Sequence, residues 1–124
     1  MLTLNHGAFL RCTNLKNIDL PDGLQKIDEY AFEGCTSLTN IDIPYTILNI
    51  NRYAFNNCTN LSTIIINAIK PPTIMSSTFK NLTNLKIYVP QKGYELYISN
   101  EPYWTRLKNS IYKIEELDES EEDD

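Results

Sequence analysis

The chain has 124 residues, of which 42% are hydrophobic, and a formal net charge of −5. One small domain with its own core fits this length, and no apolar run is long enough to span a membrane. Residues 115–124 contribute −8, so the remainder carries +3 without a compact Lys/Arg cluster, and nucleic acid is excluded as an expected partner.

The chain repeats itself every 23 residues. An Ala-Phe pair and a Cys-Thr pair recur in step, beginning at Ala8, Ala31 and Ala54 and at Cys12, Cys35 and Cys58. A fixed period of about 20–29 residues is typical of proteins whose units bury their apolar faces only by stacking on one another. The sequence therefore predicts a β-rich α/β repeat array of about three and a half units over residues 1–90.

Each repeat is predicted to contain a short strand. Apolar residues alternate with others in the segments 18–20, 41–43 and 64–66. This alternation is the pattern of a strand with one buried face. Pro21 and Pro44 follow the first two segments, and proline cannot continue a strand ladder because it lacks an N–H.

A returning arm follows each strand. Leu24 and Ile27 connect the strand to this arm in the second repeat. Ala31, Cys35 and Leu38 then recur at helical spacing. The sequence predicts a short helical turn in the returning arm.

The residue pattern of one unit is specific. Residues 27–44 read I-D-E-Y-A-F-E-G-C-T-S-L-T-N-I-D-I-P, and three successive units share most of these positions. The pattern closely resembles I-x-x-x-A-F-x-x-C-x-x-L-x-x-I-x-I-P of the BspA-type leucine-rich repeats, over about residues 7–90. The resemblance implies a right-handed solenoid with a parallel sheet on one face, used for protein binding and attachment at cell surfaces. It implies no catalytic chemistry.

The array is expected to end near Pro90. The fourth unit has Thr78 at the Ala position and Leu82 at the Cys position, and terminal repeats commonly deviate from the consensus because they cover the end of the stack. An acidic, disordered tail is predicted over 115–124. An electrostatic arm that faces the body or a partner is the alternative for this tail.

Residues 91–114 are predicted to form a C-terminal cap. The segment is aromatic and amphipathic. Trp104, Leu107, Ile111 and Ile114 follow one another at intervals that place them on one side of a helix or helix-like cap.

The N-terminal end has no comparable segment before its first Ala-Phe pair. Three alternatives remain open: Met1 is an internal start within a longer product, the exposed end pairs with another chain, or Leu2 and Leu4 form a minimal strand. An unprotected sheet edge is a template for association. The second alternative makes a homodimer through the N-terminal edge a candidate assembly.

The three cysteines are predicted to be structural. They occupy the same position in each repeat, next to inward Phe and Leu residues, so they should form a buried ladder of small apolar side chains. A zinc site usually needs four closely paired ligands, and the one histidine, His6, lies outside the ladder. No metal or other cofactor is expected, although a weak divalent cation on Asp19 and Asp42 is a side hypothesis.

Residues between the inward positions of the strands should point to solvent. One outward column consists of Asn17, Asn40 and Thr63, and the next consists of Asp19, Asp42, Ile65 and Tyr88. The second column changes from acidic to apolar and aromatic, and Ile65 beside Tyr88 suggests a small contact patch. The alternative is that Ile65 only suits a strand or lies beneath the C-terminal cap. These seven residues are the predicted binding surface.

The predicted function is a protein–protein interaction module, not an enzyme. No nucleophile with a neighbouring base, paired catalytic carboxylates or phosphate-binding loop is recognisable. The partner is expected to be a protein, without nucleic-acid binding or membrane insertion. No signal peptide is recognisable in the N-terminal residues, whereas the family resemblance suggests a surface-exposed or secreted protein. A self-associating structural repeat fragment is the alternative function.

Overall fold

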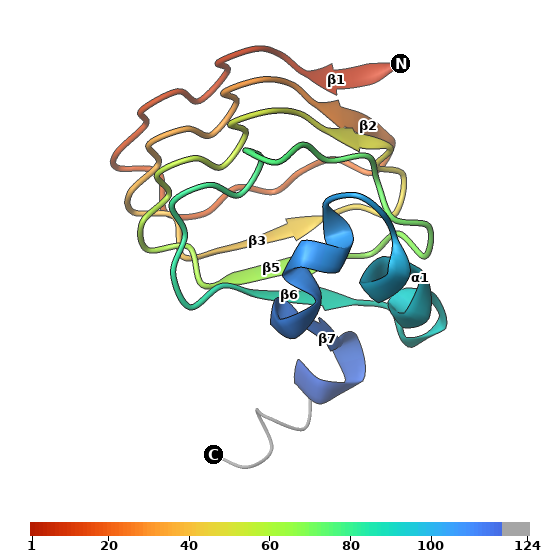
Figure 1. The fold of residues 1–124 in the computed structure, drawn as a ribbon. Coiled ribbons are helices and arrows are strands. Elements are labelled where there is room, and N and C mark those ends of the chain that lie inside the picture. The colour runs from red at the N-terminus through yellow and green to blue at the C-terminus, as the bar shows by residue number, and fades with distance from the viewer. Residues whose placement is uncertain (118–124) are drawn as a thin grey trace.

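The computed structural model describes residues 1–117, which wind between two parallel sheets (Figure 1). The first sheet has the order β1-β2-β4 and contains β1 (Leu2–Leu4), β2 (Leu24–Ile27) and β4 (Asn49–Ile50). The second sheet has the order β3-β5-β6-β7 and contains β3 (Asn40–Ile43), β5 (Thr63–Ile66), β6 (Lys86–Val89) and β7 (Ile111–Lys113). The helices include η1 (Gln91–Gly93), α1 (Tyr94–Ser99) and η2 (Trp104–Ser110), and residues 114–117 form a further helical turn after β7.

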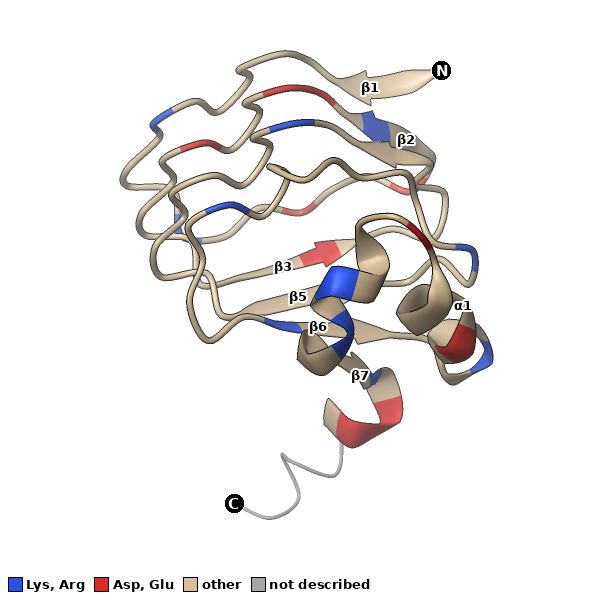
Figure 2. Ribbon diagram, viewed as in Figure 1, with Lys and Arg blue, Asp and Glu red and all other residues tan. Residues whose placement is uncertain are grey.

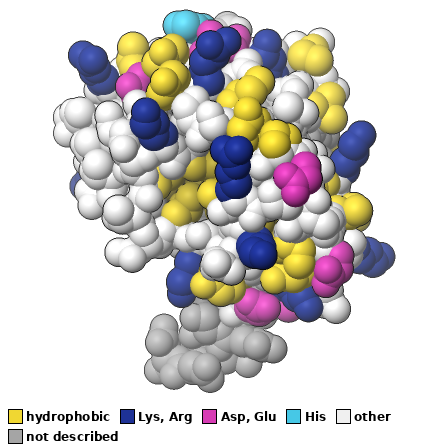
Figure 3. All heavy atoms as spheres, in the orientation of Figure 1, with side chains coloured by type: hydrophobic (Ala, Val, Ile, Leu, Met, Phe, Trp, Pro, Cys, Tyr) yellow, Lys and Arg dark blue, Asp and Glu magenta, His cyan; other side chains and the backbone are white. Residues whose placement is uncertain are grey.

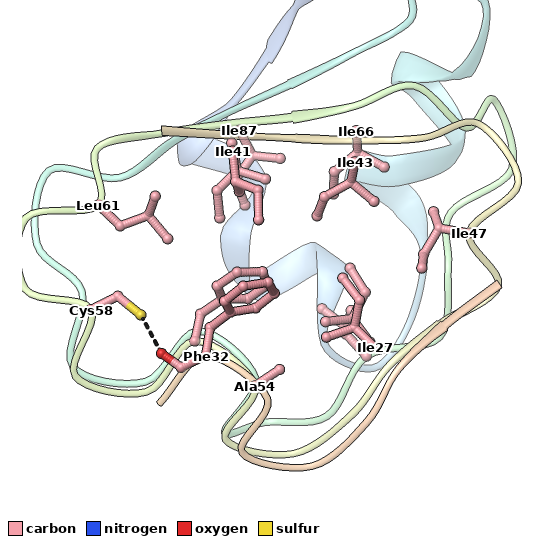
Figure 4. Packing of buried hydrophobic residues seen from close by; sticks show 14 of the residues in the cluster. Ile27, Phe32, Ile41, Ile43, Ile47, Ala54, Cys58, Leu61, Ile66 and Ile87 are labelled. Atoms are coloured by element: carbon pink, nitrogen blue, oxygen red, sulfur yellow. Dashed lines mark hydrogen bonds between the residues drawn. The ribbon is translucent and has the colours of Figure 1, made fainter. Parts of the chain in front are cut away.

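Equivalent residues of successive repeats stack into one core between the sheets. In the second sheet Ile41 pairs with Ile64, and Ile64 pairs with Ile87, so the isoleucines form an inward row. Figure 4 shows this row pointing toward Phe32 and Ile27 on the opposite side of the core. Each fully buried side chain of this size contributes about 1.5–3 kcal/mol relative to an exposed one.

The predicted strands 41–43 and 64–66 are confirmed, but two expectations about the sheets were wrong. Segment 18–20 is not a strand, and it lies at the end of the array where a strand would have a neighbour on one side only. Leu24 and Ile27, which were expected in the connection, instead lie in β2 of a second sheet, where Lys26 pairs with Asn49 and Ile27 with Ile50. Leu24 and Ile27 are three positions apart, so they do not show the alternation expected of a strand with one buried face.

The returning arms are successions of tight turns, not the predicted helical turns. We call this part of the repeats the turn side (residues 6–15, 29–38, 52–61 and 77–85). Within it Cys35 N–H donates to Phe32 C=O, whereas Phe32 N–H donates to Ala54 C=O of the next repeat. Helical spacing of the apolar residues does not produce a helix here, because alternate N–H groups bond between repeats and not within the arm.

Left-handed backbone marks the start of the first three turns. Gly7, Tyr30 and Tyr53 occupy equivalent positions with φ of 63°, 61° and 58°. Only glycine adopts this conformation without steric cost, so the two tyrosines are strained by about 1 kcal/mol or more. Their rings stack at 5.2 Å between centroids, which offsets part of this cost.

A phenylalanine ladder and a thiol ladder run along the turn side. Phe9, Phe32, Phe55 and Phe79 stack at 5.5, 5.3 and 5.8 Å between successive ring centroids. The Cys58 thiol donates to Phe32 C=O at 3.0 Å, as Figure 4 shows, and the Cys35 thiol repeats this bond one unit earlier.

Only part of the cysteine prediction is correct. Cys35 and Cys58 are buried, whereas Cys12 is exposed. The thiol of each buried cysteine reaches a carbonyl of the preceding repeat. Cys12 lies in the first repeat of the described chain and has no such neighbour to cover it.

The segment after Pro90 packs against the last repeat through two buried aromatic side chains. The Tyr97 hydroxyl donates to Ala68 C=O at 2.6 Å, and the Trp104 indole N–H donates to Pro72 C=O at 2.8 Å. Gly93 permits a close approach, because a Cβ there would lie 2.3 Å from the Ile69 carbonyl oxygen. We call residues 91–117 the C-terminal segment.

The single helical side predicted from Trp104 to Ile114 was wrong beyond Ser110. The helix η2 ends there, and Ile111 begins β7, which extends the second sheet. Pairing with β6 satisfies backbone groups that a helix would have bonded internally. The prediction of a disordered tail over 115–124 was wrong for residues 115–117, which are helical, and its remainder, 118–124, lies outside the described residues.

At the N-terminus, the alternative of a minimal strand is confirmed. Leu4 is in β1, which pairs in parallel with β2. The pairing is irregular between Leu2 and Thr3. The other edge of β1 pairs with no strand among residues 1–117.

Candidate protein-binding face

The outward residues of the second sheet form two columns, which we call the outer face. Asn40, Thr63 and Lys86 lie side by side in one column. Asp42, Ile65, Tyr88 and Tyr112 lie side by side in the other. The structure thus brings together five of the seven predicted binding residues.

The remaining two, Asn17 and Asp19, precede the first strand of this sheet and are exposed. Asp19 still lies near Asp42, because both line the same surface depression. Asn17 has no strand register to place it in the first column. The columns therefore begin one repeat later than expected, and Asp19 lies near the second column because it lines the same depression as Asp42.

Tyr88 was expected to be an exposed contact residue, but it is only 6% exposed. Its ring lies 5.6 Å from the ring of Tyr112, which β7 places beside it. The Lys86 ammonium lies 5.5 Å from the centre of the Tyr112 ring, a cation–π arrangement. Ile65 is half-buried. Because Tyr88 is buried, the accessible polar and aromatic side chains at this end of the outer face are those of Lys86 and Tyr112.

Sequence reasoning missed Tyr112 and Lys86. Residues 111–113 do alternate, but the helical spacing from Trp104 to Ile114 competed with this short strand signal. Lys86 occupies the same column position as Asn40 and Thr63, so the repeat period could have identified it.

A depression of about 300 Å³, which we call the acidic hollow, adjoins the acidic end of the outer face. Its lining residues are Ile18, Asp19, Leu20, Asp22, Asp42, Pro44, Tyr45 and Asn67. Three are carboxylates, and Tyr45 is 67% exposed at its edge. The Asn67 amide donates both to the Asp42 carboxylate and to Ile43 C=O, which fixes the Asp42 side chain.

The chemistry of the hollow suits a cationic side chain. Carboxylates attract an ammonium or guanidinium group, and an exposed tyrosine ring offers it a π face. No group of three or more His, Cys, Asp or Glu residues within residues 1–117 has the arrangement of a metal site. On the face shown in Figure 3, Lys and Arg side chains are spread over the surface, some of them beside Asp or Glu side chains.

Comparison with known families identifies the repeat. The family model described as BspA type Leucine rich repeat region (6 copies) matches residues 2–116. The chain belongs to this family. A search among curated proteins gives no match.

The BspA-type match extends beyond the motif recognised in the sequence at both ends. It includes β1 and nearly all of the C-terminal segment, so these parts belong to the leucine-rich repeat region together with the central repeats. None of the helices of this BspA-type chain within residues 1–117 is long and apolar enough to cross a membrane.

Several side chains in the BspA-type repeat region have shifted pKa values. The pKa of Cys58 is raised by its hydrogen-bond contact with the Cys35 thiol and by burial, so the neutral thiol is favoured. Burial also raises the pKa of Tyr97. The pKa of Asp28 is lowered, chiefly by the Glu29 N–H and also by Asn51, whose amide lies 3.0 Å from the carboxylate.

Proposed function

We propose that the chain is a protein–protein interaction module of a cell-surface or adhesin-like BspA-type protein, without enzymatic activity or cofactor. Its partner binds the outer face and the adjoining acidic hollow. The observation that carries the proposal is the contrast between the two sides of the same strands. Ile41, Ile64 and Ile87 are uniform and buried, whereas Asp42, Ile65 and Tyr112 change character from one strand to the next.

This contrast favours binding because the core needs uniform residues to stack, while the outer face has no such requirement. The acidic end lies beside a depression, and the other end carries a lysine over a tyrosine ring. Such a surface suits a partner with a Lys or Arg side chain for the hollow and an apolar group for Ile65. Mixed polar and aromatic surfaces are common in protein interfaces.

Site-specific photocrosslinking tests the proposal. A photoreactive residue at Ile65 should capture a defined protein from native surface extracts, whereas one at Leu48, an exposed apolar residue next to β4, should not. Affinity of the purified partner should then fall about tenfold in Asp19→Asn/Asp42→Asn, which removes two carboxylates from the hollow. Equal capture from both positions, or unchanged affinity, would count against the outer face.

We also propose that the repeats form a right-handed solenoid and that residues 91–114 cap its C-terminal end. The burial of Tyr97 and Trp104 against the last repeat supports the cap. Deletion from Gln91 onward should expose the end of the core and increase binding of a hydrophobic dye. A deletion variant with native dye binding and native thermal stability would argue against a capping role.

The second candidate function is self-association through the N-terminal end, as a structural repeat fragment. The unpaired edge of β1 and the exposed Leu2 side chain favour it. Light scattering should then give a dimer mass, which changes at Leu2 and Leu4 should reduce to the monomer mass. A dimer that survives these changes would exclude β1 as the interface.

A further inference from the structure

Two segments with nearly the same sequence differ in structure. Residues 17–21 read N-I-D-L-P and residues 40–44 read N-I-D-I-P, so they differ only in having Leu20 where the second has Ile43. The second segment contains β3, whereas residues 17–20, which we call segment 17–20, form no strand. Because both differing residues are apolar, the cause lies in the neighbours of the two segments and not in their local sequence.

Segment 17–20 lies at the end of the array, but this position is not a sufficient explanation. β1 lies at the same end and also has a neighbour on one side only, yet it pairs with β2. A strand can therefore form at this end of the stack. Segment 17–20 remains unpaired for a reason of its own.

The edge of β3 that faces the first repeat has unused backbone groups. The carbonyls of Thr39 and Ile43 accept hydrogen bonds from residues that flank β5. Successive residues of a strand direct their backbone groups to opposite edges, so those of Asn40 and Asp42 point toward segment 17–20. Within residues 1–117, the N–H and C=O groups of Asn40 and Asp42 have no backbone partner at this edge.

Segment 17–20 shows the matching deficit. No backbone N–H or C=O group of residues 16–20 forms a hydrogen bond with another of the residues 1–117. Ile18 and Leu20 are half-buried, whereas the equivalent Ile41 and Ile43 are at most 2% exposed. The acidic hollow is lined from both segments, so it lies where their pairing is missing.

Pairing of the two segments would place like charges side by side. β3 and β5 put Asp42 beside Ile65, and the same register one repeat earlier would put Asp19 beside Asp42, the acidic position on β3 in Figure 2. Paired strands lie about 4.8 Å apart, and like charges directly opposite each other are destabilising. The Asn67 amide holds the Asp42 carboxylate in place. Within residues 1–117, neither Asp19 nor Asp42 has an ion-pair partner.

We propose that repulsion between Asp19 and Asp42 holds segment 17–20 away from β3 and keeps the acidic hollow open. A positive charge between the two carboxylates lets the segment join the second sheet as a further strand, because the charge interacts more strongly when the carboxylates are close. This inference concerns the regulation of the acidic hollow. It rests on the proposed function for the source of the charge, which is the Lys or Arg side chain of the partner.

A charge series at position 19 tests the repulsion without a partner. Asp19 is exposed, so its substitution leaves the core intact. Asp19→Glu keeps the negative charge, Asp19→Asn removes it, and Asp19→Lys places an ammonium group beside Asp42. In Asp19→Lys/Asp42→Lys both groups are positive, so the repulsion returns while position 19 keeps the strand propensity of lysine.

Residue-resolved hydrogen exchange of the full chain, followed by NMR, measures the pairing. In the register of the other repeats, pairing gives acceptors to the amides of Ile18, Leu20, Asn40 and Asp42. These amides should exchange as unbonded amides in the wild type and in Asp19→Glu. They should exchange about tenfold or more slowly in Asp19→Lys, with Asp19→Asn between the two, and the double variant should return to the wild-type rates. Lys86 N–H, which donates to a carbonyl in the same sheet at 2.9 Å, is the protected reference in every variant.

Three outcomes would overturn the proposal. The first is wild-type exchange at the four amides as slow as at Lys86, which would mean that segment 17–20 is already paired. The second is unchanged exchange in Asp19→Lys with a native melting temperature by circular dichroism. The third is equal slowing in the double variant, which would make strand propensity the cause. Photocrosslinking at Ile65 does not depend on these rates, so failure here leaves the proposed partner-binding face to its own test.

Discussion

The first and second repeats share a consensus but differ in what surrounds them. Phe32 and Cys35 of the second repeat are fully buried between two neighbours. Phe9 and Cys12 of the first repeat occupy the same positions, but Phe9 is half-buried and Cys12 is exposed. In a stacked protein the neighbours on both sides, and not the residue type alone, determine how much a position contributes to stability.

The largest expected effect separates the two phenylalanines. Phe32→Ala should lower the free energy of unfolding by about 3–5 kcal/mol, because it leaves a cavity between two stacked rings. Phe9→Ala should cost about half as much or less, since its ring contacts one neighbouring ring and is half-buried. Denaturant unfolding measures both values, and equal losses would contradict the comparison.

Thiol labelling should show the next largest difference. Cys12 should react with a maleimide at the rate of a free thiol, whereas Cys35 and Cys58 should react about a hundredfold more slowly in the native protein. Their thiols are buried and bonded to carbonyls of the preceding repeat. Mass spectrometry of labelled peptides distinguishes the sites, and labelling in denaturant, where all three should react alike, is the control.

A smaller effect should distinguish the buried tyrosine of the C-terminal segment from an exposed tyrosine in the repeats. Tyr97→Phe should lower the free energy of unfolding by about 1–2 kcal/mol. The variant keeps the ring but removes the buried hydroxyl that donates to the Ala68 carbonyl oxygen at 2.6 Å. Tyr45→Phe is the matched control, since Tyr45 is 67% exposed and should change stability little. Equal effects from both variants would mean that the Tyr97 hydroxyl does not help to hold the segment.

The smallest expected effect is on the pH dependence of the unfolding free energy. It compares Asp28, whose carboxylate accepts a hydrogen bond from Asn51 of the next repeat, with an exposed carboxylate. Asp28 has a lowered pKa in the folded chain, so its carboxylate stabilises the fold above the pKa of the unfolded state, and this contribution is lost as the pH falls through the folded pKa. Asp28→Asn should flatten the dependence of unfolding free energy on pH in the acidic range. Asp22→Asn, at an exposed turn carboxylate, should leave the slope unchanged.

Much of the repeat interior could be predicted from sequence, because local alternation and the 23-residue period act on every unit in the same way. Ile41 and Ile64 were correctly placed in inward strand positions. The second sheet was missed because β4 contains only Asn49 and Ile50, too few residues for an alternating pattern. Ile111 was misassigned because helical and strand spacing overlap in short apolar segments.

The candidate site was less accessible to sequence reasoning. Asp42 and Ile65 follow from strand alternation, and they do lie side by side on the outer face. The acidic hollow joins Asp19 to Asn67 and Tyr45, which come from three different repeats. Tyr88 was predicted to be exposed, but it is buried because Tyr112 of β7 lies beside it. No local pattern encodes such contacts between distant segments.

The sequence by itself determined the repeat period, the family and the inward residues of the main strands, because each depends on local spacing. Tertiary structure decided which equivalent residues are covered. Cys12 and Cys35 have the same local sequence position, yet within residues 1–117 only Cys35 of these two donates to the carbonyl of a preceding repeat. Burial in a stacked chain is a property of neighbours, and those neighbours are separated from the residue by a whole repeat of chain.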